Sequence, residues 1–387
     1  MILHFHYSSN ENSGEIRRIK NVDSSFAKTL NTNVIEVSFV SVQLLFKKNS
    51  KFKLSNFVQK KYVLPTIPFF NSSTIALKLN SYWTSFVILL LNIIHKPTLV
   101  IGEYSTSWQS FRFNPHKIPF IIDNHGDIID EYKYNTPNAS SSRIAFMEKI
   151  ELNGVLKAKY IICQSMAMIK HLQKKYSYLN LNKEKFIEFR CSSSLDNFSY
   201  EPALRNEVRR KLNLKKDATV FIYSGGMHKW QKIDESLMLF KEFNSVKNNS
   251  YFIILTLNTE EAYDKIKSLI PELKQHIIVK SVPHNEVKDY LNAADIAFLL
   301  RDNVNLNAVA SPTKLAEYMA CGLPVISTNV SDNWLDNTSF IFNIEQNSIS
   351  ELNNFIKRIN KIEISNYAKE NLNLENDIKN LQNSIYG

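Results

Sequence analysis

Short apolar segments alternate with longer segments of helical periodicity along the first half of the chain. Apolar runs of about four to eight residues, bounded by glycine, proline or polar residues, predict buried strands. Residues 15–30, 73–95 and 166–176 have the three-to-four-residue spacing of helices. This alternation predicts a parallel sheet covered by helices on both faces, with strands at residues 2–7, 34–39, 62–67, 98–102, 119–123, 158–165 and 186–189.

The second half repeats the pattern. Helices are predicted at residues 201–212 and 233–243, and strands at residues 219–223, 251–257, 276–280, 295–300 and 325–328. Between the halves lies a small and polar run, residues 192–198, which suits a hinge. We therefore expect two α/β domains with a boundary near residue 198.

Length and composition fit two globular domains. The 387 residues are 44% apolar and 22% charged. Three widely spaced cysteines (Cys163, Cys191 and Cys321) have no metal-ligand spacing and favour a reduced, cytoplasmic compartment. The N-terminus lacks the layout of a signal peptide, and the longest apolar run, residues 86–94, is far shorter than a span of ~20 residues. We expect a soluble or peripheral protein.

Positive charge is concentrated in the first half. Residues 1–200 have 25 Lys and Arg against 14 Asp and Glu, whereas residues 201–387 have 22 against 23. Residues 47–61 contain six lysines and no acid, interleaved with apolar residues. This segment predicts either contact with an anionic membrane surface or a solvated lysine-rich face, and we weigh the two evenly. Nucleic acid is not expected, because no nucleic-acid motif accompanies the lysines.

Residues 311–328 have the local chemistry of an anion-binding helix that runs into a strand. Ser311 is a candidate N-cap, and Pro312 fits a first helical turn. The helix is expected to stop at Gly322. The N–H groups of the first turn would face an anion, and a carboxylate one turn further could accept bonds from ribose hydroxyls; these residues are Thr313, Lys314, Leu315 and Glu317. An ordinary α/β packing unit is the alternative.

This stretch resembles the nucleotide-binding signature of glycosyltransferase family 4, in particular its bacterial polysaccharide branch for O-antigen or capsule synthesis. The matching pattern is Pro-Thr-Lys-x-x-Glu-Tyr followed by a small-residue turn and Pro-Val-Ile. The resemblance implies a GT-B fold, with two Rossmann-like domains that face each other across a cleft. Residues 1–198 would bind the acceptor and residues 199–365 the nucleotide sugar. Residues 366–387 would form a helix that crosses back to the first domain.

The resemblance also implies roles for individual residues of the site. His125, in Asn124-His125-Gly126 after a strand, would contact the donor sugar at the reacting centre, and Gly14 would lie over the donor diphosphate. A structural histidine and a simple turn glycine are the alternatives. Asp127 and Glu131 could face the acceptor, although acids are also common at helix N-termini.

The paired glycines Gly225 and Gly226 begin a second phosphate-facing loop. Family members often have an arginine and a lysine in this loop, but these places fall on Gly226 and Gln231, so Lys229 or Lys232 could substitute. The first glutamate of the family's Glu-x7-Glu pair is replaced by Val309, and a nearby asparagine could supply a polar contact instead: Asn303, Asn305 or Asn307.

The function implied is sugar transfer from a UDP- or GDP-sugar to a hydroxyl, with retention at the anomeric carbon and without a metal or further cofactor. The acceptor would be a lipid-linked saccharide at the inner face of the cell membrane. One alternative is a catalytically weak GT-B subunit that binds nucleotide sugar or a partner glycosyltransferase. A nucleotide-sugar epimerase would need more carboxylates in the cleft than the sequence offers.

Overall fold

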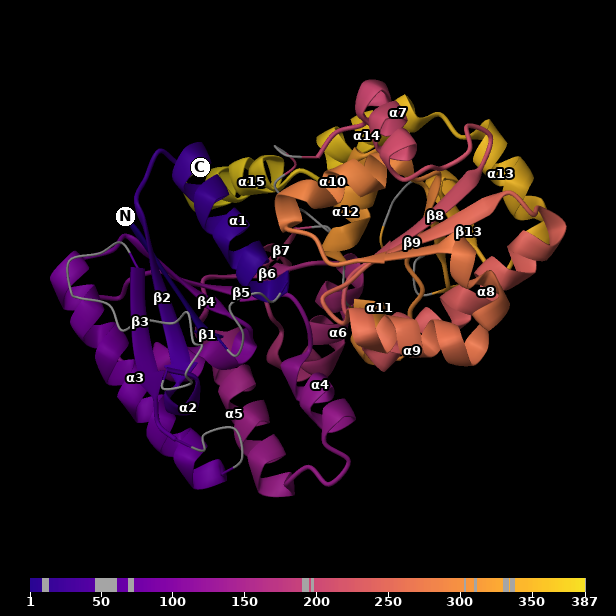
Figure 1. Ribbon diagram of the computed structural model, residues 1–387. Helices are drawn as coiled ribbons and strands as arrows, with labels where there is room; N and C mark the ends of the chain where they lie inside the picture. Colours follow the sequence, from indigo (N-terminus) through magenta and orange to yellow (C-terminus); the bar gives the residue numbers. More distant parts are fainter. Residues whose placement is uncertain are drawn as a thin grey trace. The chain divides into compact units, whose positions relative to one another are not determined.

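A computed structural model describes residues 1–8, 14–45, 61–68, 73–189, 195, 198–302, 304–309, 312–329, 334 and 338–386. The chain forms two compact units. Unit 1 comprises Met1–Phe189 and Leu374–Gly387, and unit 2 comprises Arg190–Asn373. Figure 1 shows the two units, with unit 1 in indigo and magenta apart from its yellow C-terminal segment, and unit 2 in pink, orange and yellow.

Unit 1 is built on a seven-stranded parallel sheet in the order β3-β2-β1-β4-β5-β6-β7. The apolar, largely β-branched segments of the first half form these strands, as their pattern predicts. The bounds are β1 Ile2–Ser8, β2 Val34–Ser41, β3 Lys61–Thr66, β4 Leu99–Glu103, β5 Phe120–Asn124, β6 Tyr160–Cys163 and β7 Phe186–Glu188.

Helices cover the sheet of unit 1. Helix α15 (Leu374–Tyr386) returns to this unit from the far end of the chain and packs against α1 (Gly14–Thr29). Leu374, Ile378 and Leu381 join Val22 and Phe26 in one apolar cluster. The other helices are α2 Val42–Leu45, α3 Thr74–His95, α4 Ile128–Asn135, α5 Ser141–Lys157 and α6 Met166–Lys175, with the 3-10 helix η1 at Ser105–Ser110.

The unit boundaries differ from the expected ones. The chain passes from unit 1 to unit 2 after Phe189 rather than near residue 198. The polar run that suggested a hinge contains Leu195 and Phe198, and both are buried in the core of unit 2. The returning segment begins at Leu374 rather than at residue 366, because α14 (Lys361–Asn371) packs in unit 2 through Ile364 and Ala368.

Unit 2 has a six-stranded parallel sheet in the order β10-β9-β8-β11-β12-β13. Its alternating side chains supply two apolar cores, one on each face. Val220 and Ile222 belong to one core, and Phe221 and Tyr223 to the other. The strands are β8 Thr219–Ser224, β9 Ser250–Leu255, β10 Ile277–Lys280, β11 Ile296–Phe298, β12 Val325–Ser327 and β13 Ile341–Asn343.

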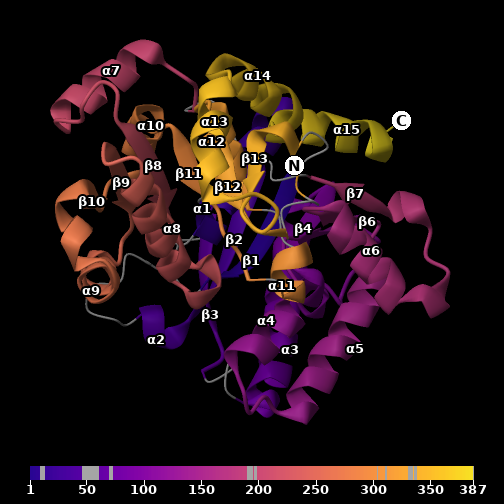
Figure 2. The same ribbon diagram turned by 90° about the vertical axis from the view of Figure 1, so that its right-hand side faces the viewer.

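The two faces of this second sheet have different helices. The core on one face is completed by α7, α10, α12 and α14, and the core on the other by α8, α9 and α13. Figure 2 shows α8 and α9 on one side of the strands and α12 and α14 on the other. The bounds are α7 Pro202–Lys211, α8 Ile233–Val246, α9 Thr259–Leu269, α10 His284–Ala293, α11 Asn305–Val309, α12 Thr313–Ala320 and α13 Leu352–Arg358.

Candidate functional site

The sheet of unit 2 has a switch point between β8 and β11. These strands are neighbours, but the chain leaves β8 toward β9 on one side and leaves β11 toward β12 on the other. Ligands of open α/β sheets bind outside the carboxyl ends of the strands at such a point. Gly225 directly follows β8, and Arg301 lies shortly after β11.

Gly225 makes room for the side chain of Lys314 from α12. A Cβ atom at residue 225 would lie 1.8 Å from Lys314 Nζ, and the backbone there has φ +153°. The ammonium lies 4.9 Å from the centre of the Tyr223 ring, 3.5 Å from the Tyr223 hydroxyl and 3.4 Å from Gln231 Oε1. The predicted glycine loop and the predicted helix start therefore meet in one place.

Gln231 contacts a second cation, Arg301, as well as Lys314. Its Oε1 accepts hydrogen bonds from Arg301 Nη1 and, at 3.1 Å, from the Tyr223 hydroxyl. Arg301 is only 9% exposed, and burial lowers the pKa of its guanidinium. Within the described part of the chain, no carboxylate pairs with this guanidinium. Two cations thus surround one neutral amide oxygen, which is an arrangement suited to an anionic ligand.

Lys229 and Lys232, the two expected substitute cations, lie in different surroundings. Lys229 is exposed on a 3-10 turn (η4, Lys229–Gln231). The Lys232 ammonium lies 3.2 Å from a carboxylate oxygen of Glu235 and 3.5 Å from one of Asp302, so its charge is already compensated. No motif in the sequence points to Arg301, which stands alone after an apolar strand.

Helix α12 begins one residue later than expected. Pro312 is the N-cap residue, with extended backbone, and Ser311 lies outside the described residues. The Leu315 N–H donates to the Pro312 carbonyl at 2.9 Å. Of the three expected anion-facing amides, that of Leu315 is therefore occupied within the helix.

The predicted end of this helix is confirmed. Gly322 has φ +73°, its N–H bonds Met319 O at 2.8 Å, and the Leu323 N–H bonds Tyr318 O at 2.9 Å. This is the Schellman arrangement that a C′ glycine permits. The following residues form β12, as predicted.

Glu317 lies on the next turn of α12, with 14% of its side chain exposed and Oε1 3.8 Å from Nε2 of His284. The neighbouring Tyr318 ties the helix to the glycine loop, because its hydroxyl accepts the Ser224 N–H at 2.9 Å. Val309 is buried, and the Asn307 amide donates to the Asp302 carbonyl. Asn303, and the side chain of Asn305, lie outside the described residues.

In unit 1, His125 follows β5 and bonds a buried acid. Its Nε2 pairs with Oε2 of Glu103, the last residue of β4, and its ring centre lies 4.1 Å from that of Tyr104. Burial alone lowers the pKa of His125, but the Glu103 carboxylate outweighs this and raises it above the ordinary value. Burial likewise raises the pKa of Glu103, and the adjacent His125 and His4 bring it well below the usual range.

A buried polar network extends from this pair. The other Glu103 oxygen accepts from His4 Nε2 at 2.7 Å, and His4 Nδ1 bonds Asp23 at 2.6 Å. Arg18 is paired with Asp123 through two contacts of 2.5 and 3.0 Å. Sequence reasoning missed Glu103, although a lone acid at the carboxyl end of a buried strand could have indicated it.

Gly14 is the first residue of α1, and the loop before it, residues 9–13, lies outside the described residues. The lysine-rich segment also lies outside them, apart from Lys61. The Lys61 ammonium bonds Glu36 at 2.9 Å.

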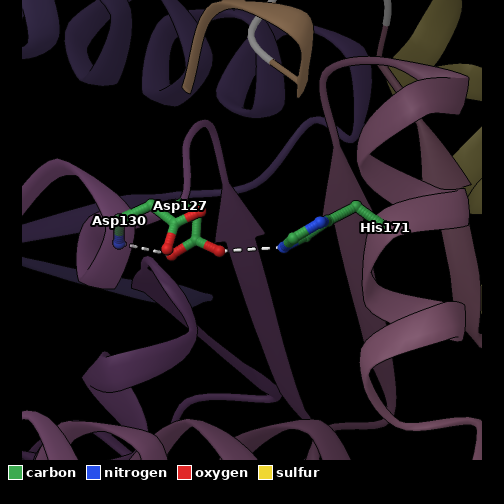
Figure 3. Close-up of side chains that lie close together, drawn as sticks. All are labelled: Asp127, Asp130 and His171. Atoms are coloured by element: carbon green, nitrogen blue, oxygen red, sulfur yellow. Dashed lines mark hydrogen bonds and ion pairs between the residues drawn. The ribbon is translucent and has the colours of Figure 1, made fainter. Parts of the chain in front are cut away.

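Asp127, Asp130 and His171 form a group that could be mistaken for a metal site, and Figure 3 shows their arrangement. Oδ1 of Asp127 caps α4 by accepting the N–H groups of Ile129 and Asp130, each at 3.0 Å. Its Oδ2 accepts from His171 Nε2 at 2.9 Å. Although burial opposes it, pairing with His171 and the nearby Lys175 lowers the Asp127 pKa to about 2. Capping and ion pairing thus explain the group.

Solved structures identify the class of fold. Sucrose-phosphate synthase from Thermosynechococcus elongatus superposes with a TM-score of 0.69 over 100% of this chain and 99% of its own, at 13% identity. Alr3699/HepE from Anabaena, solved in complex with UDP, superposes with a TM-score of 0.66 over 99% of both chains, at 12% identity. Together with the two Rossmann-like sheets, these likenesses show that the chain has the GT-B fold.

Sequence comparison points to the second unit in particular. The family model described as "Glycosyl transferases group 1" matches residues 205–370, which include the glycine loop, Arg301 and α12. A teichuronic acid biosynthesis glycosyltransferase from Bacillus subtilis (strain 168), TuaC, is 23% identical over 214 residues. This match covers 55% of the chain and 48% of TuaC, so the chain spans about half the length of this relative.

Proposed function

We propose that this protein is a glycosyltransferase that moves a sugar from a UDP- or GDP-sugar to a hydroxyl group. The observation that carries the proposal is that Lys314 and Arg301 both contact the side-chain oxygen of Gln231 beside Gly225. The match of residues 205–370 to group 1 glycosyl transferases supports it, and so does the UDP complex of the structurally similar HepE.

In this proposal the donor diphosphate lies at the switch point of unit 2. Arg301 and Lys314 bind its charge, and the Thr313 and Lys314 amides at the start of α12 face it. Glu317, one turn further, accepts hydrogen bonds from the ribose hydroxyls. Arg301 replaces the phosphate-binding cations that family members often have at the places of Gly226 and Gln231. The side chain of Gln231 positions Arg301 by accepting its hydrogen bond.

The transfer proceeds with retention in this proposal. The bond between the anomeric carbon and the phosphate oxygen breaks, and the acceptor oxygen attacks from the same face. The acceptor proton passes to the departing phosphate. We assign stabilisation of the charge on the leaving group to Arg301 and Lys314 rather than to a metal ion. His125 contacts a donor-sugar hydroxyl through Nδ1, because Glu103 engages its Nε2.

For the acceptor we propose a lipid-linked saccharide of cell-surface polysaccharide synthesis, which places the protein in the cytoplasm at the inner face of the membrane. The similarity to a teichuronic acid biosynthesis enzyme supports the saccharide class. The net charge of +11 over residues 1–200, from 25 basic and 14 acidic residues, supports contact with an anionic surface.

A panel of nucleotide sugars tests the proposal by thermal shift, because a ligand that binds the native state raises the melting temperature. We expect one UDP- or GDP-sugar to stabilise the protein and to release nucleoside diphosphate slowly in water. Absence of any stabilisation across the panel would overturn the proposal.

The replacement of the expected glutamate by buried Val309 favours a second candidate, a catalytically weak subunit that binds nucleotide sugar or a partner glycosyltransferase. The same panel separates the two. Stabilisation without hydrolysis, and without transfer to any saccharide acceptor, would favour the binding subunit.

A further inference from the structure

Helix α3 exposes a set of large apolar side chains, and its buried face mixes polar residues with Leu77, Val87, Ile88 and Leu91. Apart from Lys78, every exposed residue of the helix is apolar or aromatic: Ile75, Leu79, Tyr82, Trp83, Phe86, Leu90, Ile93 and Ile94, which are 38–73% exposed. The buried residues include Asn80, Ser81, Thr84, Ser85 and Asn92. The exposed face of a surface helix in a soluble protein is ordinarily polar, so the apolar exposed face of α3 is unusual.

Hydrogen bonds on the buried face fix this orientation. Oδ1 of Asn80 accepts the Ile67 N–H at 3.0 Å, and the Thr84 hydroxyl lies 2.9 Å from that of Ser110 and 3.1 Å from that of Tyr7. By length and composition α3 alone, among the described helices, could cross a membrane. These bonds instead hold it lengthwise against unit 1, at the outer side in Figure 1. The apolar stripe, defined here as its eight exposed apolar residues, therefore faces outward along one side of the unit.

Two exposed lysines border the stripe: Lys78 within α3 and Lys96 at its C-cap. Residues 37–102 contain no Asp or Glu. Arg112 connects the stripe to a pocket, because its guanidinium lies 4.5 Å from the ring centre of exposed Tyr82 and bonds the Ser81 hydroxyl at 2.7 Å.

That pocket has a volume of about 540 Å³ and no acidic residue in its lining. Four cations line it beside the aromatic rings of Trp108 and Phe111: Arg112, Lys117, Lys157 and Lys159. A basic, partly aromatic hollow next to an apolar stripe is complementary to a phosphate headgroup above an acyl layer.

We propose that the apolar stripe of α3 docks unit 1 onto an anionic phospholipid bilayer, with a lipid phosphate in the pocket lined by Arg112. The helix lies in the plane of the interface, and its bulky side chains reach the boundary of the acyl region. A second copy of the chain suits this face less well, because a two-fold dimer would bring the same basic border against itself. The inference deepens the membrane placement proposed above and rests on the proposed function only for the lipid-linked acceptor.

Vesicle sedimentation tests this docking. The full chain is mixed with phosphatidylcholine vesicles containing about one quarter phosphatidylglycerol, and with phosphatidylcholine alone. We expect binding to the anionic vesicles and at least tenfold weaker binding when Phe86→Glu and Leu90→Glu are combined. The matched control combines Leu257→Glu and Ile362→Glu, which introduces the same charge at exposed apolar residues of unit 2. It should bind as the unmodified protein does.

Two further readings complete the test. Combining Lys117→Gln and Lys157→Gln should weaken binding to anionic vesicles and leave binding to neutral ones unchanged. Equal vesicle binding by the α3 variant and the unmodified protein would overturn the proposal, as would loss of a dimer in that variant with binding retained. Nucleotide-sugar stabilisation, measured on the same samples, reports on the proposed donor site separately, so failure of one proposal does not imply failure of the other.

Discussion

The ammonium of Lys314 occupies the space that a side chain at residue 225 would fill, since a Cβ there would lie 1.8 Å from it. The glycine of a phosphate loop is usually explained by close approach of the ligand. In this protein, Gly225 also admits a cation from a helix that follows much later in the sequence. The loop and α12 are therefore in direct contact, as the single anion site that we propose requires.

Gly225→Ala should displace Lys314 and weaken nucleoside diphosphate binding about tenfold, which is about 1.4 kcal/mol. Calorimetric titration with UDP and GDP measures this. Gly226→Ala is the matched control, because a Cβ there would lie 3.2 Å from the exposed side chain of His228, which can shift. Similar losses of nucleoside diphosphate affinity in both variants would contradict a specific role for Gly225, because any added side chain in the loop would then weaken binding.

Glu317→Ala should weaken nucleotide binding by about 10- to 100-fold, the range for one or two hydrogen bonds to a charged group. His125→Ala should leave donor affinity nearly unchanged and lower turnover, because His125 is assigned to the reacting sugar. Titration and rate measurements on both variants check this division. Unchanged nucleotide affinity in the Glu317 variant would disprove its assignment to the ribose.

Glu103→Gln should lower the pKa of His125, because the carboxylate that raises it is removed. A pKa that is higher in the folded protein than the unfolded value of about 6.5 stabilises the fold below that pH, and this stabilisation is lost as the pH rises through the folded value. We therefore expect the unmodified protein to lose stability above about pH 6.5, and the variant to lose less. Histidine ring NMR and denaturant unfolding between pH 5 and about 9 measure both effects.

Glu36→Gln is the control for that experiment. Glu36 bonds His6 and Lys61 in the same unit, so its removal changes a partly buried ion pair without touching His125. An unaltered His125 titration in Glu103→Gln would contradict the assigned pairing.

The sequence pattern was sufficient for every strand of the first sheet, for five of the six strands of the second and for the end of α12 at Gly322, but it missed the short edge strand β13. These features depend on local chemistry: apolar runs form buried strands, and glycine adopts positive φ. The pairing of Lys232 with Asp302, and of Arg301 with Gln231, depends on which strands become neighbours, and no local pattern encodes that. We therefore predicted Lys229 or Lys232 as the phosphate-binding cation, whereas the fold places Arg301 beside Gln231.

The exposed face of α3 illustrates the same limit. Its periodicity predicts a helix, but periodicity cannot tell which face the sheet covers, and the polar residues Asn80 and Thr84 would ordinarily be assigned to the solvent side. The unit boundary shows the same limit of sequence patterns. The run near residue 195 is mostly polar, but its apolar residues Leu195 and Phe198 pack in the core of unit 2.

The most direct test of the central claim measures the affinity of Arg301→Gln for UDP and GDP, and for uridine and guanosine. If Arg301 binds the diphosphate, affinity for the preferred nucleoside diphosphate falls at least tenfold, about 1.4 kcal/mol, and affinity for the nucleoside does not change. Arg301→Lys, which retains the charge, should recover part of the loss. Diphosphate affinity in Arg301→Gln equal to that of the unmodified protein, with the fold intact, would contradict the account.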